Sequence, residues 1–191
     1  LMYKMLLIGL SAGGIPLVKR LITALPKDYS LAVVVLAHLP QGHESNLAQI
    51  LDDACDLPVT MAADQQAIVA GHIYVAPPDY HLLVEQSSSF VFALSEDKPV
   101  KSVRPSIDVL FKSAAEVCGA DLIAVILSGA NSDGAEGMAR VKQLDGLCIV
   151  LNPADAEFNT MPNAVIKQVL VDYSVSLDDI ISLLLSVDEK I

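Results

Sequence analysis

Apolar segments of strand length alternate with amphipathic segments along most of the chain. The apolar segments are residues 3–10, 31–37, 121–127 and 147–151, with a shorter candidate at 59–61. Segments whose apolar residues recur at helical spacing lie at 15–25, 45–53, 135–143, 161–168 and 177–187. Runs that are apolar throughout are typical of parallel strands buried on both faces. The alternation predicts an α/β fold, a doubly wound and mostly parallel sheet with helices on both faces.

The middle of the chain has a different pattern. Three short β-like pieces, at 73–76, 82–85 and 90–94, are separated by Pro77-Pro78-Asp79 and by Ser87-Ser88-Ser89. Turn signals this close together predict a small antiparallel β-hairpin or edge region.

The remaining segments complete a single domain. Arg104-Pro105-Ser106 opens a further helix that runs to about residue 117, and a short apolar piece at 169–171 lies between the last two helices. No internal repeat, low-complexity segment or linker interrupts the pattern. We therefore expect one domain over residues 1–191.

Composition narrows the class of protein. Of the 191 residues, 53% are hydrophobic and 18% are charged, which excludes a disordered chain. The mean hydropathy is +0.50, but no apolar run reaches the ~20 residues of a membrane span, so we expect no membrane insertion. The formal charge of −11 argues against nucleic acid as a partner. Three widely spaced cysteines suit a reducing compartment, and we expect a cytoplasmic protein.

Three strand ends carry residues that a hydrolase uses. Ser11 follows the first strand, His38 follows the second, and Asp133 lies in the loop after the strand at 121–127. In a doubly wound sheet the ligand site lies beyond the carboxyl ends of the strands. Serine, histidine and aspartate form catalytic triads in any chain order, so these ends are candidates for one site.

The serine lies in Gly9-Leu10-Ser11-Ala12-Gly13, which fits G-x-S-x-G between a strand and a helix. Small neighbours permit a sharp turn and leave the hydroxyl open to substrate. The N–H groups at the start of the following helix are suited to stabilise an oxyanion. Two other interpretations stay open: Ser11 as a plain helix N-cap, and a dinucleotide loop, although that loop needs glycine at this position.

His38 and Asp133 each have a structural alternative. His38 closes a strongly buried strand, unlike His43, His72 and His81, but a half-buried loop histidine is a common structural residue. Asn131-Ser132-Asp133 precedes a helix, so any of the three is suited to cap it. Two other aspartates, Asp79 and Asp108, are expected to lie away from the strand-end cleft. No histidine follows Asp133, which argues against the α/β-hydrolase fold with its order Ser, Asp, His.

The order of these motifs resembles the catalytic domain of the chemotaxis protein-glutamate methylesterases, the CheB family. The resemblance covers nearly the whole chain, and six segments in the same order carry it. They are Ile8–Gly14, Ala37–Pro40, Gly71–Pro77, Arg104–Phe111, Leu127–Ala135 and Ala156–Pro162.

The resemblance implies roles for individual residues. Ser11 is the implied nucleophile, His38 the general base and acid, and Asp133 the residue that orients the histidine. The backbone N–H groups of Ala12 and Ala130 are the implied oxyanion hole. The implied substrates are glutamate methyl esters, and in some members glutamines, on the cytoplasmic helices of chemoreceptors. Neither a metal nor a cofactor is implied.

The chain departs from the family pattern in two loops. Where the family often has Gly-Met-Gly-Asn-Asp-Gly, this chain has Gly129-Ala130-Asn131-Ser132-Asp133-Gly134, so alanine replaces a methionine that borders the site. Asn163 stands where the family usually has arginine. The family's regulatory receiver domain and linker are expected to lie outside these 191 residues, and a receiver or methyltransferase domain is a candidate partner in the full-length protein.

The leading hypothesis is a serine esterase that hydrolyses receptor glutamate methyl esters in bacterial chemotaxis. The alternative is a non-catalytic domain of the same fold that binds a receptor or signalling partner, and a nucleotide-binding domain is a weaker one. Because receptor helices are also rich in glutamate, we expect Lys98, Lys101 and Arg104 to form a local contact surface near the cleft.

Overall fold

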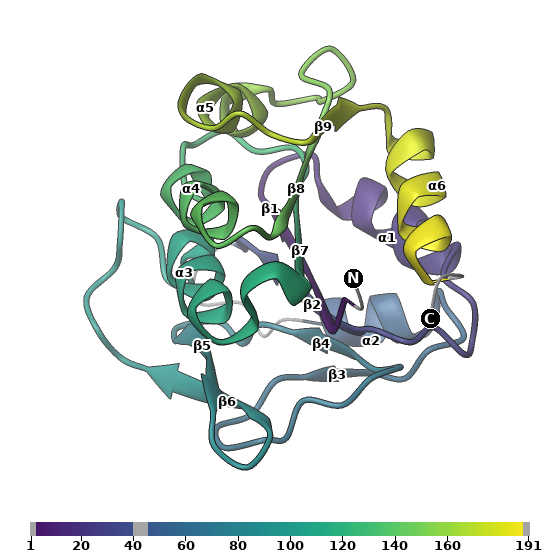
Figure 1. The fold of residues 1–191 in the computed structure, drawn as a ribbon, viewed down its shortest axis with the longest axis vertical. Helices are drawn as coiled ribbons and strands as arrows, with labels where there is room; N and C mark the ends of the chain where they lie inside the picture. Colours follow the sequence, from purple (N-terminus) through teal and green to yellow (C-terminus); the bar gives the residue numbers. More distant parts are fainter. Residues whose placement is uncertain (1–2, 40–45, 189–191) are drawn as a thin grey trace.

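A seven-stranded parallel sheet forms the centre of the molecule (Figure 1), whose computed structural model describes residues 3–39 and 46–188. The strand order is β3-β4-β2-β1-β7-β8-β9, and every neighbouring pair is parallel. The strands are β1 (Met5–Leu10), β2 (Ala32–Ala37), β3 (Val59–Met61), β4 (Ile73–Val75), β7 (Leu122–Ile126), β8 (Leu147–Leu151) and β9 (Tyr173–Val175). The doubly wound parallel sheet predicted from the alternation of apolar and amphipathic segments is confirmed.

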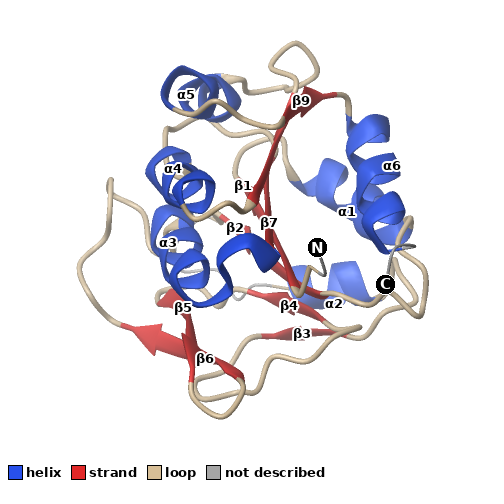
Figure 2. Cartoon of the chain, viewed as in Figure 1, coloured by secondary structure: helices blue, strands red, loops and turns tan. Residues whose placement is uncertain are grey.

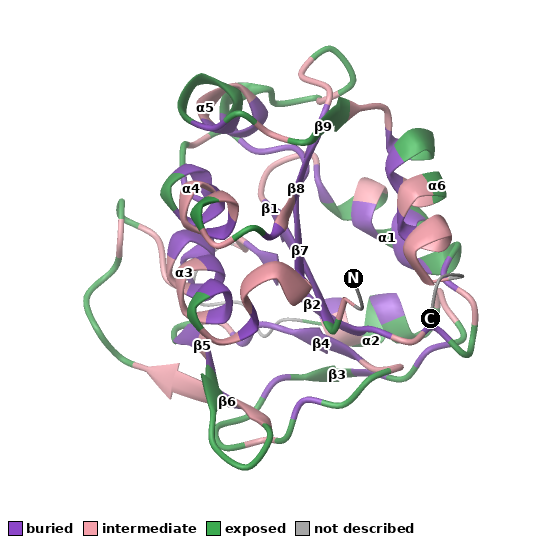
Figure 3. Cartoon of the chain, viewed as in Figure 1, coloured by how far each residue is buried: buried purple, intermediate pink, exposed green. Residues whose placement is uncertain are grey.

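In the part of the chain that the structure describes, six α-helices cover the two faces of this sheet (Figure 2). They are α1 (Ile15–Thr23), α2 (Leu47–Asp52), α3 (Ile107–Cys118), α4 (Ala135–Gln143), α5 (Thr160–Gln168) and α6 (Leu177–Asp188). One face carries α3, α4 and α5, and the other carries α1, α2 and α6. Every residue of β1, β2 and β7 is therefore buried (Figure 3), which explains why these strands read as uninterrupted apolar runs. None of the helices in the described residues is long and apolar enough to cross a membrane.

An antiparallel hairpin packs beside α3. Strands β5 (His81–Gln86) and β6 (Phe90–Ser95) pair with each other, and they bury Leu82, Val84 and Phe92 in the core on that side of the sheet. The third piece assigned to this region from the sequence, 73–76, is not part of it. It forms β4, which lies between β2 and β3 in the main sheet. The assignment was wrong because a three-residue buried strand has too short a pattern to show which sheet it joins.

The last strand also differs from the sequence pattern. Residues 169–171 form no strand, and Leu170 is 88% exposed. The strand is instead β9, whose Tyr173 and Ser174 are exposed because it lies at the edge of the sheet. A polar edge strand of three residues lacks the apolar run on which strand prediction depends.

The sheet reverses its direction of winding at β1. From β1 the chain moves to β2 on one side and reaches β7 on the other, with Leu10 opposite Ala37 and Gly9 opposite Ile126. Ligand sites of doubly wound sheets lie beyond the carboxyl ends of the strands at such a switch point. The loops after β1, β2 and β7 meet there.

Candidate active site

Ser11 lies in a tight turn between β1 and α1. The Gly14 N–H donates to the Ser11 carbonyl at 3.0 Å, and Gly13 has a φ of +73°, which favours glycine. A Cβ at Gly13 would lie 2.9 Å from the Cβ of Glu157, so the turn also has no room for a side chain there. The N-cap of α1 is Gly14, with no side-chain cap bond. The N-cap interpretation of Ser11 is therefore wrong.

Backbone hydrogen bonds place Ser11 between the two other strand ends. The His38 N–H donates to the Leu10 carbonyl at 3.1 Å, and the Ser11 N–H donates to the Ser128 carbonyl at 2.8 Å. These bonds extend the pairing of β1 with β2 and with β7 beyond the last paired residues of the strands. The serine is thus held in register with His38 on one side and with the loop that carries Asp133 on the other.

His38 and Asp133 contact each other directly. His38 Nε2 lies 2.9 Å from Asp133 Oδ2, and the side chains are 9% and 0% exposed. Among the described residues, no side-chain hydrogen bond joins Ser11 to His38. Because Nε2 faces the aspartate, Nδ1 is the ring nitrogen left to face a serine.

Asp133 caps a helix, but not the one that follows it. Its Oδ1 accepts from the Ser106 hydroxyl at 2.8 Å and the Asp108 N–H at 3.1 Å, and its Oδ2 accepts from the Ile107 N–H at 2.6 Å. These donors form the start of α3. Burial acts to raise the pKa of Asp133, but the hydrogen bonds it accepts, that of His38 first, outweigh burial and hold the pKa below its ordinary value.

Asp108, in the first turn of α3, caps the start of α4, the helix that follows Asp133. One carboxylate oxygen accepts from the Gly134 N–H at 2.9 Å and the Gly137 N–H at 2.7 Å, at the start of α4. The other accepts from Lys101 Nζ at 2.7 Å. Burial raises the pKa of Asp108, and the Lys101 ammonium offsets this only in part. The expectation that Asp108 lies away from the cleft was wrong: α3 begins beside α4, so the first turns of both helices meet under Asp133.

The two backbone N–H groups implied as an oxyanion hole have no acceptor among the described residues. Those of Ala12 and Ala130 make no intramolecular hydrogen bond there. Ser128 ties their loops together, because its hydroxyl donates to the Ala12 carbonyl at 2.8 Å and accepts from the Phe158 N–H at 3.0 Å. The loop after β8 is also joined to the loop after β7 by the Gly129 N–H, which donates to the Phe158 carbonyl at 2.9 Å.

Comparison with known proteins identifies the family. The model described as CheB methylesterase matches residues 6–184. A relative from Leptospira interrogans is 40% identical over 188 residues, which are 98% of this chain and 96% of that protein. The crystal structure of the Thermotoga maritima CheB methylesterase catalytic domain has a TM-score of 0.92 at 33% identity, covering 97% of this chain and 99% of that one. The chain belongs to the CheB methylesterase family.

Some CheB-family relatives are about twice as long. The protein-glutamate methylesterase/protein-glutamine glutaminase of Hydrogenovibrio crunogenus is 33% identical over 189 residues, which are 98% of this chain but 50% of that protein. The chain therefore spans about half the length of that relative and nearly all of the Leptospira protein.

Asn131 contacts the proposed base of this CheB-family site. Its Nδ2 lies 3.1 Å from His38 Nδ1, and its Oδ1 accepts from the Asp133 N–H at 3.0 Å. The sequence offered Asn131 only as a candidate cap for the next helix. The signal that could have indicated a role at the site was a departure from the family pattern quoted above, which has glycine at this position. Glycine has no side chain with which to contact the histidine.

The other described histidines, His72 and His81, make contacts that support the structure. His72 stacks on Tyr74 with ring centroids 4.4 Å apart and bonds the Thr60 hydroxyl. His81 is 2% exposed and accepts from the Ser106 N–H. His43 lies outside the described residues.

A cleft of about 260 Å³ opens beside His38. It is lined by His38, Leu39, Ser102, Val103, Arg104 and Pro105. The guanidinium of Arg104 donates to the carbonyls of Glu96 and Asp97, which holds the polar loop before α3 against this wall. Lys101 pairs with Asp108 and Glu136 instead. Of the three basic residues expected to form a surface near the cleft, Arg104 lines it, Lys98 is not among its lining residues, and Lys101 is paired with two carboxylates.

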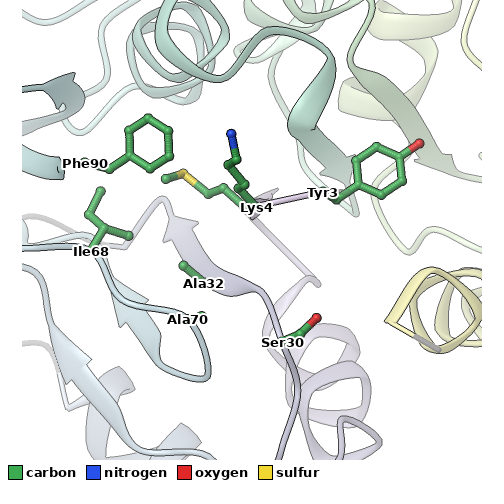
Figure 4. A pocket seen from close by; sticks show the side chains of 8 residues that line it. Tyr3, Lys4, Ser30, Ala32, Ile68, Ala70 and Phe90 are labelled. Carbon is green, nitrogen blue, oxygen red and sulfur yellow. The ribbon is translucent and has the colours of Figure 1, made fainter. Parts of the chain in front are cut away.

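A second cavity of about 260 Å³ lies at the other end of the strands, where β1 and β2 begin (Figure 4). It is lined by Tyr3, Lys4, Met5, Ser30, Ala32, Ile68, Ala70 and Phe90. These residues stand before or at the first residues of β1 and β2, and near the hairpin. None of the predicted site residues contributes to this cavity.

Proposed function

We propose that this CheB-family chain hydrolyses glutamate methyl esters on the cytoplasmic helices of chemoreceptors and deamidates receptor glutamines by the same route. The observation that carries the proposal is the His38–Asp133 hydrogen bond, formed one strand away from a serine in a strand-to-helix turn. Family membership and the activities named for the Hydrogenovibrio relative support the reaction class.

The first half of the reaction forms an acyl-enzyme. Ser11 Oγ attacks the ester carbonyl carbon as its proton passes to His38 Nδ1. The carbonyl electrons move onto oxygen, and the N–H groups of Ala12 and Ala130 donate to that oxyanion. The C–O bond to methoxide then breaks, and methanol leaves with the proton that His38 held.

Water completes the cycle. His38 Nδ1 takes a proton from water as the hydroxide attacks the acyl carbon, and the Ser11 Oγ–carbon bond breaks with return of the proton to the serine. The products are the glutamate side chain and free enzyme. On a glutamine substrate the same steps release ammonia in place of methanol.

Asp133 supports both halves. It accepts a hydrogen bond from His38 Nε2 and carries the negative charge that stabilises the imidazolium. Three donors at the start of α3 keep its carboxylate ionised and fixed, so the histidine ring has one favoured orientation.

The partner and the compartment follow from the same proposal. A cytoplasmic receptor helix would approach the cleft beside His38, which Arg104 lines, and would also meet Phe158, which is 41% exposed in the loop after β8. Since the net charge of −11 repels an acidic receptor helix at long range, docking depends on local contacts such as these. A receiver or methyltransferase domain in the full-length protein is the proposed source of regulation.

Replacement of the nucleophile tests the proposal. Ser11→Ala should remove methanol release from methylated receptor and labelling by a fluorophosphonate probe, while Ser174→Ala, on the exposed edge strand β9, should keep both. Oxyanion donors and binding alone leave ~10³–10⁴-fold catalysis over water, so a small residual rate is expected. Methanol release by Ser11→Ala at the parent rate would rule the serine mechanism out.

A non-catalytic receptor-binding domain is the second candidate. It is favoured by the contact of Asn131 with His38 Nδ1, which occupies the atom that must accept the serine proton. The same probe separates the two candidates: no labelling of the parent together with receptor binding would favour the binding domain.

A further inference from the structure

The orientation of the Asn131 side chain fixes the protonation of His38. A backbone N–H only donates, so the atom of Asn131 that faces the Asp133 N–H at 3.0 Å is the carbonyl oxygen Oδ1. The amide nitrogen Nδ2 therefore faces His38 Nδ1 at 3.1 Å. Because an amide nitrogen donates and does not accept, Nδ1 carries no proton and receives this hydrogen bond.

The other ring nitrogen completes the assignment. His38 Nε2 lies 2.9 Å from the Asp133 carboxylate, which only accepts when ionised, so Nε2 carries the proton. The neutral ring thus holds its acceptor atom toward the loop before α4. That atom is the one the proposed mechanism uses, and in the described structure it is engaged by Asn131 rather than by Ser11.

We propose that Asn131 is a positioning residue that holds His38 in the Nε2–H tautomer and occupies Nδ1 until the Ser11 hydroxyl takes its place. The inference rests on the proposed serine mechanism. When the Ser11 proton passes to Nδ1, both Nδ1 and Asn131 Nδ2 are donors, and the amide must withdraw. Asn131 therefore favours the neutral ring and disfavours the imidazolium.

The charged groups around His38 act in both directions. Asp133, from the loop before α4, favours the imidazolium. Behind it lies Asp108 of α3, whose charge is paired with Lys101. Arg104, on the cleft wall, is a positive group that opposes a second positive charge. Since Asn131→Gly leaves these groups in place and adds no charge, a change in the pH dependence of His38 in that variant reports the loss of the amide contact.

Two variants separate the contact from loop structure. Asn131→Gly removes the side chain altogether. Asn131→Asp keeps an oxygen that can accept from the Asp133 N–H, but it cannot donate to Nδ1 and instead favours a protonated Nδ1. Ser132→Ala, the neighbouring exposed position, is the matched control. Thermal unfolding of all three shows whether the fold is retained.

The main measurement follows the His38 ring nitrogens by ¹⁵N NMR across pH on the whole chain. In the parent at neutral pH, Nδ1 should have the shift of an unprotonated nitrogen and Nε2 that of a protonated one. In Asn131→Gly the imidazolium should form at a pH about 0.5–1 unit higher, the value expected for loss of one hydrogen bond to the neutral ring. In Asn131→Asp the shift should be larger and in the same direction, and in Ser132→Ala it should be absent.

The second measurement is the pH profile of fluorophosphonate labelling at Ser11. The acidic limb should move to higher pH in both Asn131 variants, and on the plateau Asn131→Gly should label at least as fast as the parent, since Ser11 then has no competitor for Nδ1. A ring titration of Asn131→Gly that moves by less than about 0.2 pH units, under half of the smallest expected shift of about 0.5 unit, or a slower plateau with an unmoved limb, would overturn the role of Asn131. Labelling that survives Ser11→Ala would instead overturn the serine mechanism, while the NMR titration still decides the contact.

Discussion

Two cavities of the same volume, about 260 Å³, lie at opposite ends of the parallel strands. We call these ends the carboxyl edge and the amino edge of the sheet, and only the cavity at the carboxyl edge has residues suited to catalysis. At the carboxyl edge the cavity adjoins His38, and two buried carboxylates lie nearby, each accepting hydrogen bonds from the start of a neighbouring helix. At the amino edge the lining is mainly apolar, with Ile68 and Phe90 beside Ala32 (Figure 4). Volume alone therefore does not locate the site.

The difference follows from the direction of the chain in a parallel sheet. Each strand ends at the carboxyl edge, and the next helix begins there, so unpaired N–H groups gather at that edge. They stabilise carboxylates and, in the proposed reaction, an oxyanion. The amino edge receives helix C-termini instead, and its charged residue Lys4 pairs with Asp121 outside the core. The carboxyl ends of the strands are therefore the place where this fold offers backbone donors to a hydrolase site.

The largest expected effect on activity comes from a substitution at the carboxyl edge, at Asp133. Asp133→Asn should lower the turnover rate on methylated receptor by about 10³–10⁴-fold, because the amide no longer stabilises the imidazolium. Methanol release measures the rate, and Asp155→Asn, in the exposed loop after β8, is the control that should leave it unchanged. A loss of less than tenfold would mean that the His38–Asp133 contact serves structure alone.

The opposite outcome is expected at the amino edge. Ile68→Ala enlarges an existing cavity and should reduce the free energy of unfolding by about 2–4 kcal/mol, with no change in the labelling rate of Ser11. Urea unfolding measures the first quantity. Val69→Ala, at a neighbouring position that is 52% exposed, should change stability by no more than about 0.5 kcal/mol. Slower labelling in Ile68→Ala would show that the two edges are coupled.

The pH dependence of stability sharpens the comparison within the carboxyl edge. Because the pKa of Asp133 is lowered, its stabilisation is present above the unfolded value of 3.8 and is lost as the pH falls through the folded pKa. The pKa of Asp108 is raised, so its contribution is full below 3.8 and declines as the pH rises through the folded pKa.

Urea unfolding of the parent and two variants between about pH 3 and pH 6 tests this contrast. The stability lost in Asp133→Asn should shrink toward the acid end of the range, and the stability lost in Asp108→Asn should shrink toward the neutral end. Parallel curves for the two variants would show that the two carboxylates do not differ in this way.

Much of this architecture was readable from the sequence for a physical reason. Strands buried on both faces must be apolar throughout, so β1, β2 and β7 were visible, and their ends identified the positions of Ser11, His38 and Asp133. The His38–Asp133 contact agrees with the proposed triad, while the catalytic roles stay predictions.

The contacts that hold the site were not readable, because they join segments far apart in the chain. The structural alternative for Asp133 was a cap of the helix that follows it, and only the packing of α3 on α4 shows that it caps the start of α3 instead. The role of Asp108 follows from the same packing. The hydrogen bond from Asn131 to His38 spans 93 residues of sequence and depends on a side-chain rotamer, which a pattern of residue types does not encode.

The start of α3 is capped by Asp133, from the loop before α4, and the start of α4 is capped by Asp108 of α3. The chain therefore becomes competent for hydrolysis only late in folding. Asp133 is held by the first turn of α3, and Asp108 by the first turn of α4, so neither carboxylate has its donors until the two helices dock. A partly folded chain that has formed both helices separately would contain Ser11, His38 and Asp133 and still lack an oriented base. During refolding, the ability to react with an electrophilic probe should therefore appear together with native tertiary packing, after helix formation.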